Sequence, residues 1–259
     1  MARKIVITSG KGGVGKTTCT ALIGLNLAKL GAKVVLLDVD IGLNNLDVVA
    51  GIDDKTNYDI VDVIQKKCRI SQALIQHQSI PLLYFLPSMH SQNFGQIDST
   101  DIKSIIENLD QSFDFIIIDC PAGIGLEFHR AVFNASEAII ISTPQFISIK
   151  DANVVSNLLC GYNLNSVKLI VNRTRKDLIH KNKMLSSYQI AQALELPLLG
   201  EIPELDEITA LSSLQGGIFA LSDKMSTPFK IISQSIYNGI NIQNSCFKIF
   251  RKKEKRNGA

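Results

Sequence analysis

The chain has 259 residues, of which 46% are hydrophobic and 20% charged, and its formal net charge is +3 at pH 7. This balance excludes an intrinsically disordered chain, and the length suits one α/β domain with a large buried core. No apolar run approaches the roughly 18 residues of a membrane span, and the first residues lack the apolar stretch of a signal peptide. The five cysteines are scattered without a Cys-x-x-Cys pair, which indicates reduced thiols in the cytosol rather than disulfides or a zinc site.

Short β-branched runs alternate with helical patterns along the chain. We expect strands at residues 5–8, 33–37, 82–86, 113–118, 138–142, 167–171 and 198–202. We expect helices at residues 21–28, 101–110, 149–159, 181–194 and 228–242. Runs such as residues 115–118 are apolar on both sides of the pleat, which is typical of a central parallel sheet. The predicted fold is therefore α/β, with a doubly wound, mostly parallel sheet, helices on both faces, and ligands beyond the carboxyl ends of the strands.

A glycine-rich segment lies between the first predicted strand and the first predicted helix. It fits the phosphate-loop pattern G-x-x-x-x-G-K-[ST], in the strand–loop–helix context that the motif needs. Its glycines let backbone N–H groups converge on phosphate oxygens, and the helix dipole favours the negative charge. We expect Lys16 to reach the β- and γ-phosphates and the Thr17 hydroxyl to bind Mg²⁺. A chance glycine-rich turn would match neither the motif nor its context. The nucleotide-binding residues predicted here are Gly10, Lys11, Gly12, Gly13, Val14, Gly15, Lys16, Thr17 and Thr18.

Lys11 is an extra lysine near the start of this loop. An ordinary phosphate loop does not need it, and a solvated loop residue is the simple explanation. A flexible cation beside a nucleotide can instead neutralise a partner's phosphates, as an arginine finger does. Residues 11–18 resemble the deviant Walker A motif of the ParA/MinD ATPase superfamily. The resemblance implies a nucleotide-sandwich dimer in which Lys11 acts across the interface.

Carboxylates follow two of the predicted strands. Residues 34–37 lead into Asp38 and Asp40, which strand alternation points the same way. Residues 115–118 lead into Asp119, a Walker B pattern whose carboxylate holds Mg²⁺ directly or through water. A solvated strand-end carboxylate is the alternative, but the phosphate loop upstream favours the metal site.

Several further segments closely resemble the MinD family within this superfamily. Residues 37–47 are similar to its switch I region and residues 119–124 to its switch II, and residues 58–65 match as well. The resemblance implies that Asp40 positions or activates the attacking water and that Asp38 supports the metal site. Position 44 is Asn, where the family is associated with a basic residue.

The identity of the base can be argued separately. Residues 172–175 read Asn-Arg-Thr-Arg and lack the aspartate of the GTPase motif N-K-x-D, so ATP is the expected nucleotide. The resemblance assigns Asn172 to the adenine edge with Arg173 beside it. It also places Pro203 and Glu204 in the adenine-side loop. A plain loop residue is the alternative for each.

The tail is strongly basic. Residues 246–259 carry six Lys or Arg and one Glu, a net charge of +5 that leaves −2 for the rest of the chain. On a helical projection Phe247, Ile249 and Phe250 share one face, and Lys248, Arg251 and Lys252 lie opposite. These features are typical of an interfacial membrane helix. We therefore expect an ATPase domain at residues 1–243 and an amphipathic membrane-targeting tail at residues 244–259, and hence a cytoplasmic protein peripheral on the inner face of the cell membrane. A disordered basic tail and a nucleic-acid-binding tail are the alternatives.

The resemblance implies an ATPase of cell-division site placement that uses ATP and Mg²⁺. It implies an ATP-dependent homodimer, a MinC-like division inhibitor, and a MinE-like or other topological factor that stimulates hydrolysis. The family's partners dock on the helix that begins near Ser148, so Ser148 and Asp151 are candidate contacts. An ordinary exposed helix start with Ser148 as its N-cap explains the same residues equally well.

Four other functions are alternatives to cell-division site placement. A flagellar-number regulator of the same superfamily also has a membrane tail and is not fully excluded by residues 41–47. A ParA-type DNA-partitioning ATPase would need a basic folded surface, and the slight acidity of residues 1–245 counts against nucleic-acid binding. An iron–sulfur member would need paired cysteines, for which Cys120 and Cys160 show no pattern. A small-molecule kinase lacks a legible acceptor site.

Overall fold

The computed structural model describes the chain except for residues 40–44, 51–57, 89–97, 212–216 and 240–259. In the described part, eight strands form one sheet in the order β3-β4-β2-β5-β1-β6-β7-β8. All neighbours are parallel except β3 (Ile75–Gln76), which runs antiparallel to β4 (Leu83–Leu86) at one edge. The other strands are β1 (Arg3–Thr8), β2 (Val34–Asp38), β5 (Phe115–Asp119), β6 (Glu137–Ser142), β7 (Ser166–Thr174) and β8 (Leu198–Pro203).

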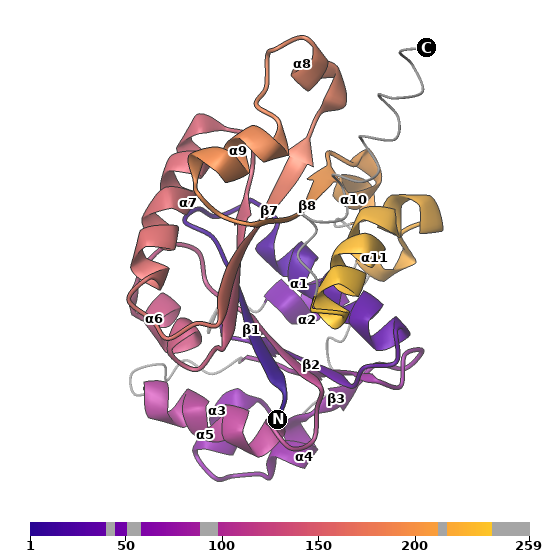
Figure 1. The fold of residues 1–259 in the computed structure, drawn as a ribbon. Coiled ribbons are helices and arrows are strands. Elements are labelled where there is room, and N and C mark those ends of the chain that lie inside the picture. The colour runs from indigo at the N-terminus through magenta and orange to yellow at the C-terminus, as the bar shows by residue number, and fades with distance from the viewer. Residues whose placement is uncertain (40–44, 51–57, 89–97, 212–216, 240–259) are drawn as a thin grey trace.

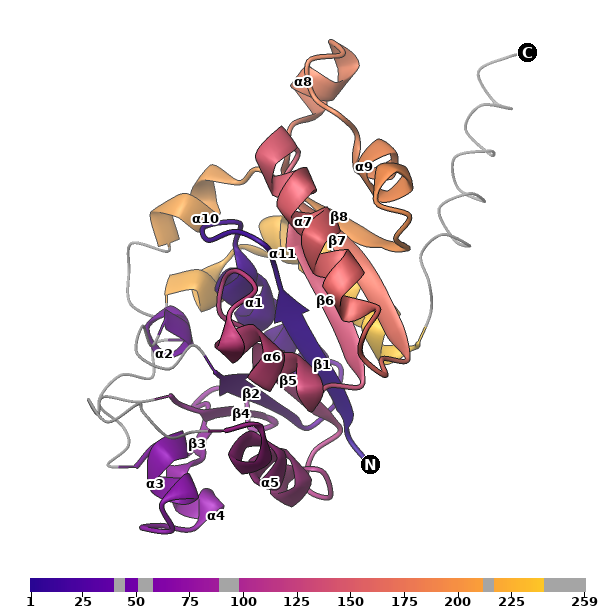
Figure 2. The same cartoon turned by 90° about the vertical axis from the view of Figure 1, so that its left-hand side faces the viewer.

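Helices cover both faces of this sheet (Figures 1 and 2). One face carries α5 (Ser99–Leu109), α6 (Leu126–Phe133), α7 (Phe146–Leu159) and α9 (Ser187–Ala193). The other face carries α1 (Lys16–Lys29), α2 (Asn45–Ala50) and α11 (Asp223–Tyr237). Shorter elements are α3 (Ile60–Ile64), α4 (Ile70–Ala73), α8 (Lys176–His180), α10 (Asp206–Leu211) and the 3₁₀ turn η1 (Gly217–Ala220).

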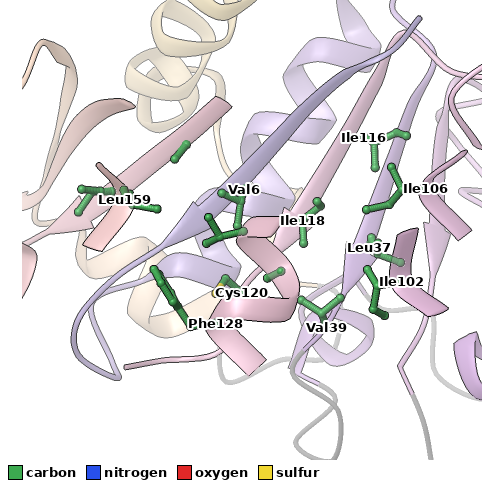
Figure 3. Close-up of a cluster of buried hydrophobic side chains, with 14 of the residues drawn as sticks. Val6, Leu37, Val39, Ile102, Ile106, Ile116, Ile118, Cys120, Phe128 and Leu159 are labelled. Atoms are coloured by element: carbon green, nitrogen blue, oxygen red, sulfur yellow. The ribbon is translucent and has the colours of Figure 1, made fainter. Parts of the chain in front are cut away.

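Strand alternation divides the apolar residues between two cores. In β1, Val6 belongs to the cluster under α5, α6 and α7, whereas Ile5 and Ile7 belong to the cluster under α1 and α11. Figure 3 shows Val6 with Ile118 and Phe128 in the first cluster. Both faces are covered, so the central strands are apolar throughout, as the sequence predicted. The doubly wound α/β fold is confirmed.

Each predicted strand and helix has an observed counterpart, but several bounds differ, and the structure adds helices that were not predicted, namely α2, α3, α4, α6, α8 and α10. All seven predicted strands are present, and β3 adds a short antiparallel strand of two residues. The predicted helix at residues 181–194 is wrong in its first half, because α9 begins at Ser187 after Ser186 caps it by accepting the Gln189 N–H. The last predicted helix begins earlier than expected, since α11 starts at Asp223 and takes Pro228 into its interior.

The predicted amphipathic tail at residues 244–259 lies outside the described residues. Among the residues that are described, no helix combines the length and hydropathy that crossing a membrane requires.

One guanidinium ties α11 to the amino-terminal edge of the sheet. Arg3 Nε and Nη2 donate to the two carboxylate oxygens of Glu137 at 2.7 and 2.8 Å. Arg3 also donates to the Ile236 carbonyl in the last turn of α11 and lies 5.2 Å from the Phe115 ring centroid. Charge-assisted, bidentate bonds of this kind are the stronger class of hydrogen bond. Arg3 therefore joins β1, β5, β6 and α11 through one side chain.

The Arg3–Glu137 pair predicts a pH dependence of stability. Burial raises the pKa of Glu137, but the hydrogen bonds and charge of Arg3, with smaller contributions from Ser166 and Lys168, hold that pKa below its usual range. A depressed pKa contributes stability above the pKa of the unfolded chain, and this is lost as the pH falls through the folded value. We expect Glu137→Gln to lower the free energy of unfolding by about 1–3 kcal/mol at pH 7, and the loss to shrink below about pH 4.

Urea unfolding at a neutral and an acidic pH measures this difference. Glu107→Gln is the matched control, because Glu107 pairs with Lys103 at 3.8 Å on the surface and its side chain is 63% exposed. A loss in free energy of unfolding that is the same for Glu137→Gln at both pH values would contradict the prediction.

Candidate nucleotide-binding site

The glycine-rich loop connects β1 to α1 and places its two lysines in different environments. Gly13 and Gly15 have φ angles of 75° and 96°, a region that favours glycine. Lys16 is the first residue of α1 and is buried, with 9% exposure. Lys11 is exposed, and its ammonium has no ion-pair partner among the residues that the structure describes. One lysine is thus held inside the loop while the other is free to reach outward.

The predicted metal-site carboxylates end two adjacent strands. Asp38 of β2 and Asp119 of β5 are register partners, and both are buried. Thr17 Oγ1 donates to Asp119 Oδ2 at 2.7 Å, and Asp38 Oδ2 accepts the Leu46 N–H at 3.3 Å. The structure therefore brings Thr17 to Asp119 directly and places Asp38 on the neighbouring strand end. Asp40, the predicted water-positioning residue, lies outside the described residues.

Thr20 is a further residue of this cluster that was not predicted. Its Oγ1 donates to Asp119 Oδ1 at 2.9 Å, so both oxygens of this carboxylate accept a hydroxyl of α1. Its spacing from Thr17 could have indicated it, because residues three apart share one face of a helix.

The oxygen donors at this edge suit a magnesium ion. Mg²⁺ prefers carboxylate and hydroxyl oxygens and is held by few protein ligands together with substrate phosphates. Thr17, Asp119 and Asp38 supply such oxygens next to the phosphate loop. When bound there, the ion would neutralise phosphate charge.

A cavity of about 280 Å³ lies beside the loop and collects the residues predicted for the base. Gly15 contributes from the loop and Thr18 from the first turn of α1, and Asn172, Arg173 and Pro203 contribute from the carboxyl ends of β7 and β8. The pocket therefore joins the phosphate loop to the predicted adenine side. Glu204 lines it as well.

Asn172 supports the loop through its amide group. Its Nδ2 donates to the Val14 carbonyl at 2.8 Å, and its Oδ1 accepts the Arg173 N–H at 2.9 Å. A Cβ atom added to Gly15 would lie only 2.5 Å from the same Nδ2. Asn172 thus packs against the loop where only glycine fits.

The apolar wall of the cavity has no clear signal in the sequence. It is formed by Leu205, Ile208 of α10 and Phe229 of α11. Phe229 is more than 200 positions from the loop, and its apolar character is what any core-facing helix residue would have. The flat ring of a nucleotide base would pack against this apolar surface.

Of the two partner contacts predicted at the start of α7, Ser148 needs correction. Ser148 is 3% exposed and its Oγ accepts the Thr143 N–H at 3.0 Å, so it cannot serve as a surface contact. It is not the N-cap either, because α7 begins at Phe146 and Gln145 precedes it. Ser148 is buried because it satisfies the turn that leads from β6 into α7.

Asp151 and Gly123, which lies in the segment that resembles switch II, both lie against the phosphate loop. A Cβ atom on Gly10 would lie 2.5 Å from the Asp151 carbonyl oxygen, so α7 packs directly on the start of the loop. Gly123 has a φ angle of 92° and donates its N–H to the Ser9 carbonyl at 3.2 Å. Residues 119–124, which resemble switch II, therefore contact the start of the loop through Gly123.

The close approach of Asn172 to Gly15 predicts an effect beyond backbone strain. Gly15 and Gly31 share a φ angle of 96°, but nothing lies within 4 Å of a Cβ atom on Gly31. Alanine at either position costs about 1 kcal/mol through the positive φ. We expect only Gly15→Ala to lower Mg-ADP affinity, by about tenfold or more, because it displaces Asn172 and the loop. Titration with a fluorescent ADP analogue measures this, and equal losses in both variants would contradict it.

The two cysteines considered for the iron–sulfur alternative, which show no ligand pattern in the sequence, lie at opposite ends of the strands in the structure. Cys120 is buried directly after β5, at the carboxyl edge, and Cys160 is exposed after α7, whose end lies at the amino edge. They do not form a paired ligand site. Cys19 is also buried, and burial raises its pKa to about 12.

Comparison with known proteins agrees with this site. Residues 1–240 match the ParA family model, described as NUBPL iron-transfer P-loop NTPase. A septum site-determining protein MinD of Synechocystis is 42% identical over 228 residues, which cover 88% of this chain and 85% of that protein.

Solved structures point to the same relatives. The MinC:MinD cell division protein complex of Aquifex aeolicus matches with a TM-score of 0.84 and 36% identity, covering 92% of this chain and 96% of that one. MinD of Pyrococcus horikoshii, solved with Mg-ADP, matches with a TM-score of 0.80 and 29% identity, covering 91% and 96%. The chain therefore belongs to the MinD family of P-loop ATPases within the ParA/MinD superfamily.

Proposed function

We propose that this protein is a cell-division ATPase that helps to place the septum, cycling between a cytosolic monomer and a membrane-bound dimer. The observation that carries the proposal is the pair of lysines in one loop, with Lys16 buried at the start of α1 and Lys11 exposed. A single chain needs only Lys16 for its own nucleotide. An exposed second lysine fits a role on the nucleotide of another copy. The names of the relatives support the role in septum placement.

The site residues have separate roles in this proposal. Lys16 binds the β- and γ-phosphates, and Thr17, Asp38 and Asp119 hold the Mg²⁺ that accompanies ATP. The base enters the cavity beside Asn172, and Asp40 positions the attacking water. Lys11 of the second copy neutralises charge that develops on the phosphates, so hydrolysis requires the dimer.

Lys11→Ala tests the dimer directly. We expect this variant to bind Mg-ADP as the wild type does, to stay monomeric with ATP, and to hydrolyse ATP about 10³-fold more slowly, since a cation supplied in trans has an effect of this order. Analytical ultracentrifugation with ATP and a phosphate-release assay measure the two effects. Lys29→Ala is the matched control, because Lys29 is an exposed lysine at the far end of α1. Normal ATP-dependent dimerisation of Lys11→Ala would overturn the proposal.

The basic tail supports membrane attachment in the dimer. Each Lys or Arg near an anionic surface contributes about 1 kcal/mol, and each partly buried Phe or Ile adds about 1–2 kcal/mol. Ordering the tail offsets several kcal/mol, so one copy binds weakly. Two tails joined in a dimer bind far more tightly through effective concentration. ATP would thus control both dimerisation and attachment to the inner face of the membrane, and hydrolysis would release the protein.

Sedimentation with anionic liposomes tests this switch. We expect the wild type to pellet with ATP and not with ADP, and a chain lacking residues 246–259 to stay in solution with either nucleotide. Phe247→Ser with Phe250→Ser keeps the tail charge but removes the apolar anchors, and we expect it to lose most pelleting as well. Unchanged pelleting of the truncated chain would show that the tail is not the anchor.

Partners of the same kind as those of its relatives complete the proposal. MinD of Aquifex aeolicus has been solved with MinC, so we propose a MinC-like inhibitor as a partner of the dimer. A MinE-like or other topological factor would stimulate hydrolysis. The exposed residues around the start of α7 are available for such contacts, whereas Ser148 is not.

A further inference from the structure

The carboxylate of Asp119 accepts hydrogen bonds from two hydroxyl groups of α1. Thr17 Oγ1 donates to Asp119 Oδ2 at 2.7 Å, and Thr20 Oγ1 donates to Asp119 Oδ1 at 2.9 Å. A hydroxyl group has a single hydrogen, so each threonine is committed to one oxygen of the carboxylate. Thr17 and Asp119 belong to the proposed Mg²⁺ site, whereas that site gives Thr20 no role of its own.

The two threonines differ in their access to a ligand. Thr17 is half-buried in the first turn of α1, whereas Thr20 is 0% exposed and Asp119 is 2% exposed. Oδ2 is therefore bonded to the threonine beside the phosphate loop, and Oδ1 is bonded to a hydroxyl group inside the protein. A completely buried hydroxyl group cannot touch a nucleotide, so any effect of Thr20 on the site must pass through Asp119.

The close packing of α1 on the sheet lets this short side chain reach Asp119. Thr17, Thr20 and Gly24 follow one another at helical spacing and share one face of α1. A Cβ atom added to Gly24 would lie only 2.4 Å from Leu36 Cδ2 of β2, so there is little room for a side chain between helix and strand. The position of α1 is thus fixed by packing next to Thr20, and the helix does not depend on the Thr20 hydroxyl group alone.

The bond from Thr20 to Asp119 is not forced by the helix or by burial. A threonine within a helix can donate to the carbonyl group three or four residues earlier in the chain, but Thr20 donates to the carboxylate. Thr8 shows that this fold tolerates a buried hydroxyl group without a partner. Its side chain is 0% exposed, and its Oγ1 has no hydrogen-bond partner among the residues that the structure describes. The contact between Thr20 and Asp119 therefore calls for an explanation at the carboxylate.

We propose that Thr20 is a positioning residue for Asp119 and thereby for the Mg²⁺ that accompanies the nucleotide. By holding Oδ1, it fixes the rotation of the carboxylate and keeps Oδ2 beside Thr17 on the loop side. Without this bond the carboxylate would be free to turn, because the last torsion of an aspartate is broad. Groups that hydrogen-bond to metal ligands commonly change metal affinity about 10–100-fold when they are removed. The inference rests on the role that the proposed function gives to Asp119.

A purely structural role for Thr20 would have a different signature. If Thr20 only compensated the buried charge of Asp119, its loss would weaken folding, or would weaken nucleotide binding equally with and without the metal ion. A positioning role changes the part of the binding that depends on Mg²⁺. That part is the ratio of the affinity for ADP in Mg²⁺ to the affinity for ADP in EDTA, called the magnesium ratio here.

Thr20→Val tests the proposal, because valine is β-branched like threonine but has no hydroxyl group. The full chain is titrated with a fluorescent ADP analogue, once with Mg²⁺ and once in EDTA. We expect Thr20→Val to lower the magnesium ratio about tenfold or more, while its affinity in EDTA stays within about twofold of the wild type. Thr20→Ser keeps the hydroxyl group and should restore the wild-type ratio. An equal fall of both affinities in Thr20→Val would overturn the proposal.

Thr8→Val is the matched control. It makes the same substitution at a buried threonine that ends β1, where no hydrogen bond to another described residue is lost. We expect its magnesium ratio to equal that of the wild type, and a loss shared by both valine variants would contradict a specific role for Thr20. Urea unfolding checks that the variants fold. If Thr20→Val does not fold, Thr20→Ala replaces it, since alanine also removes the hydroxyl group and adds no methyl group beside the carboxylate.

Asp119→Asn separates a failure of this inference from a failure of the proposed metal site. We expect it to lower the magnesium ratio, and adding Thr20→Val should change the ratio little further, because Thr20 acts through the carboxylate. If Asp119→Asn lowers the ratio and Thr20→Val does not, the metal site stands and the role of Thr20 is rejected. If Asp119→Asn leaves the ratio unchanged, the proposed metal site is wrong and the inference fails with it.

Discussion

The phosphate loop keeps its shape because neighbouring segments fill the space up to its backbone. Asp151 of α7 lies where a side chain on Gly10 would be, and Asn172 lies where one on Gly15 would be. Asn172 also bonds to the Val14 carbonyl. The N–H groups of this loop must converge on phosphates, and its glycines have no side chains that could hold its shape. Neighbouring segments of the chain therefore support the loop. The rest of the site depends on this packing.

The same packing makes distant segments neighbours of the nucleotide. β7 brings Asn172 to the loop, α7 brings Asp151, and α11 contributes Phe229 to the cavity. At its other end, α11 is held by Arg3 through the Ile236 carbonyl. One helix thus extends from the nucleotide cavity to the amino-terminal edge of the sheet, and the predicted tail follows it in the chain. Any change on the base-binding side of the cavity that moves α11 would strain the hydrogen bonds of Arg3.

Net charge proved a poor guide to the surface of this protein. In the sequence, the excess of basic residues lies in the tail, and residues 1–245 have a net charge of −2. In the structure, residues 173–183 concentrate a net charge of +4 in and around α8, while the acidic residues that balance this charge are spread over other elements. A sum over the chain cannot reveal such a patch, because electrostatic attraction depends on where charges lie and is screened beyond about 10 Å.

The sequence by itself determined the features that depend on near neighbours in the chain. Apolar runs gave the seven parallel strands, and the motif gave the loop with Lys16 and Thr17, because periodicity and glycine spacing act locally. The position of Asp119 followed in the same way. Only the tertiary structure decided that Thr20 shares the Asp119 carboxylate, that Phe229 forms a wall of the cavity, that Ser148 is buried, and that a groove opens beside Phe146. Most of these features join segments far apart in sequence, and all depend on how α1, α7, α8 and α11 pack rather than on any pattern within them.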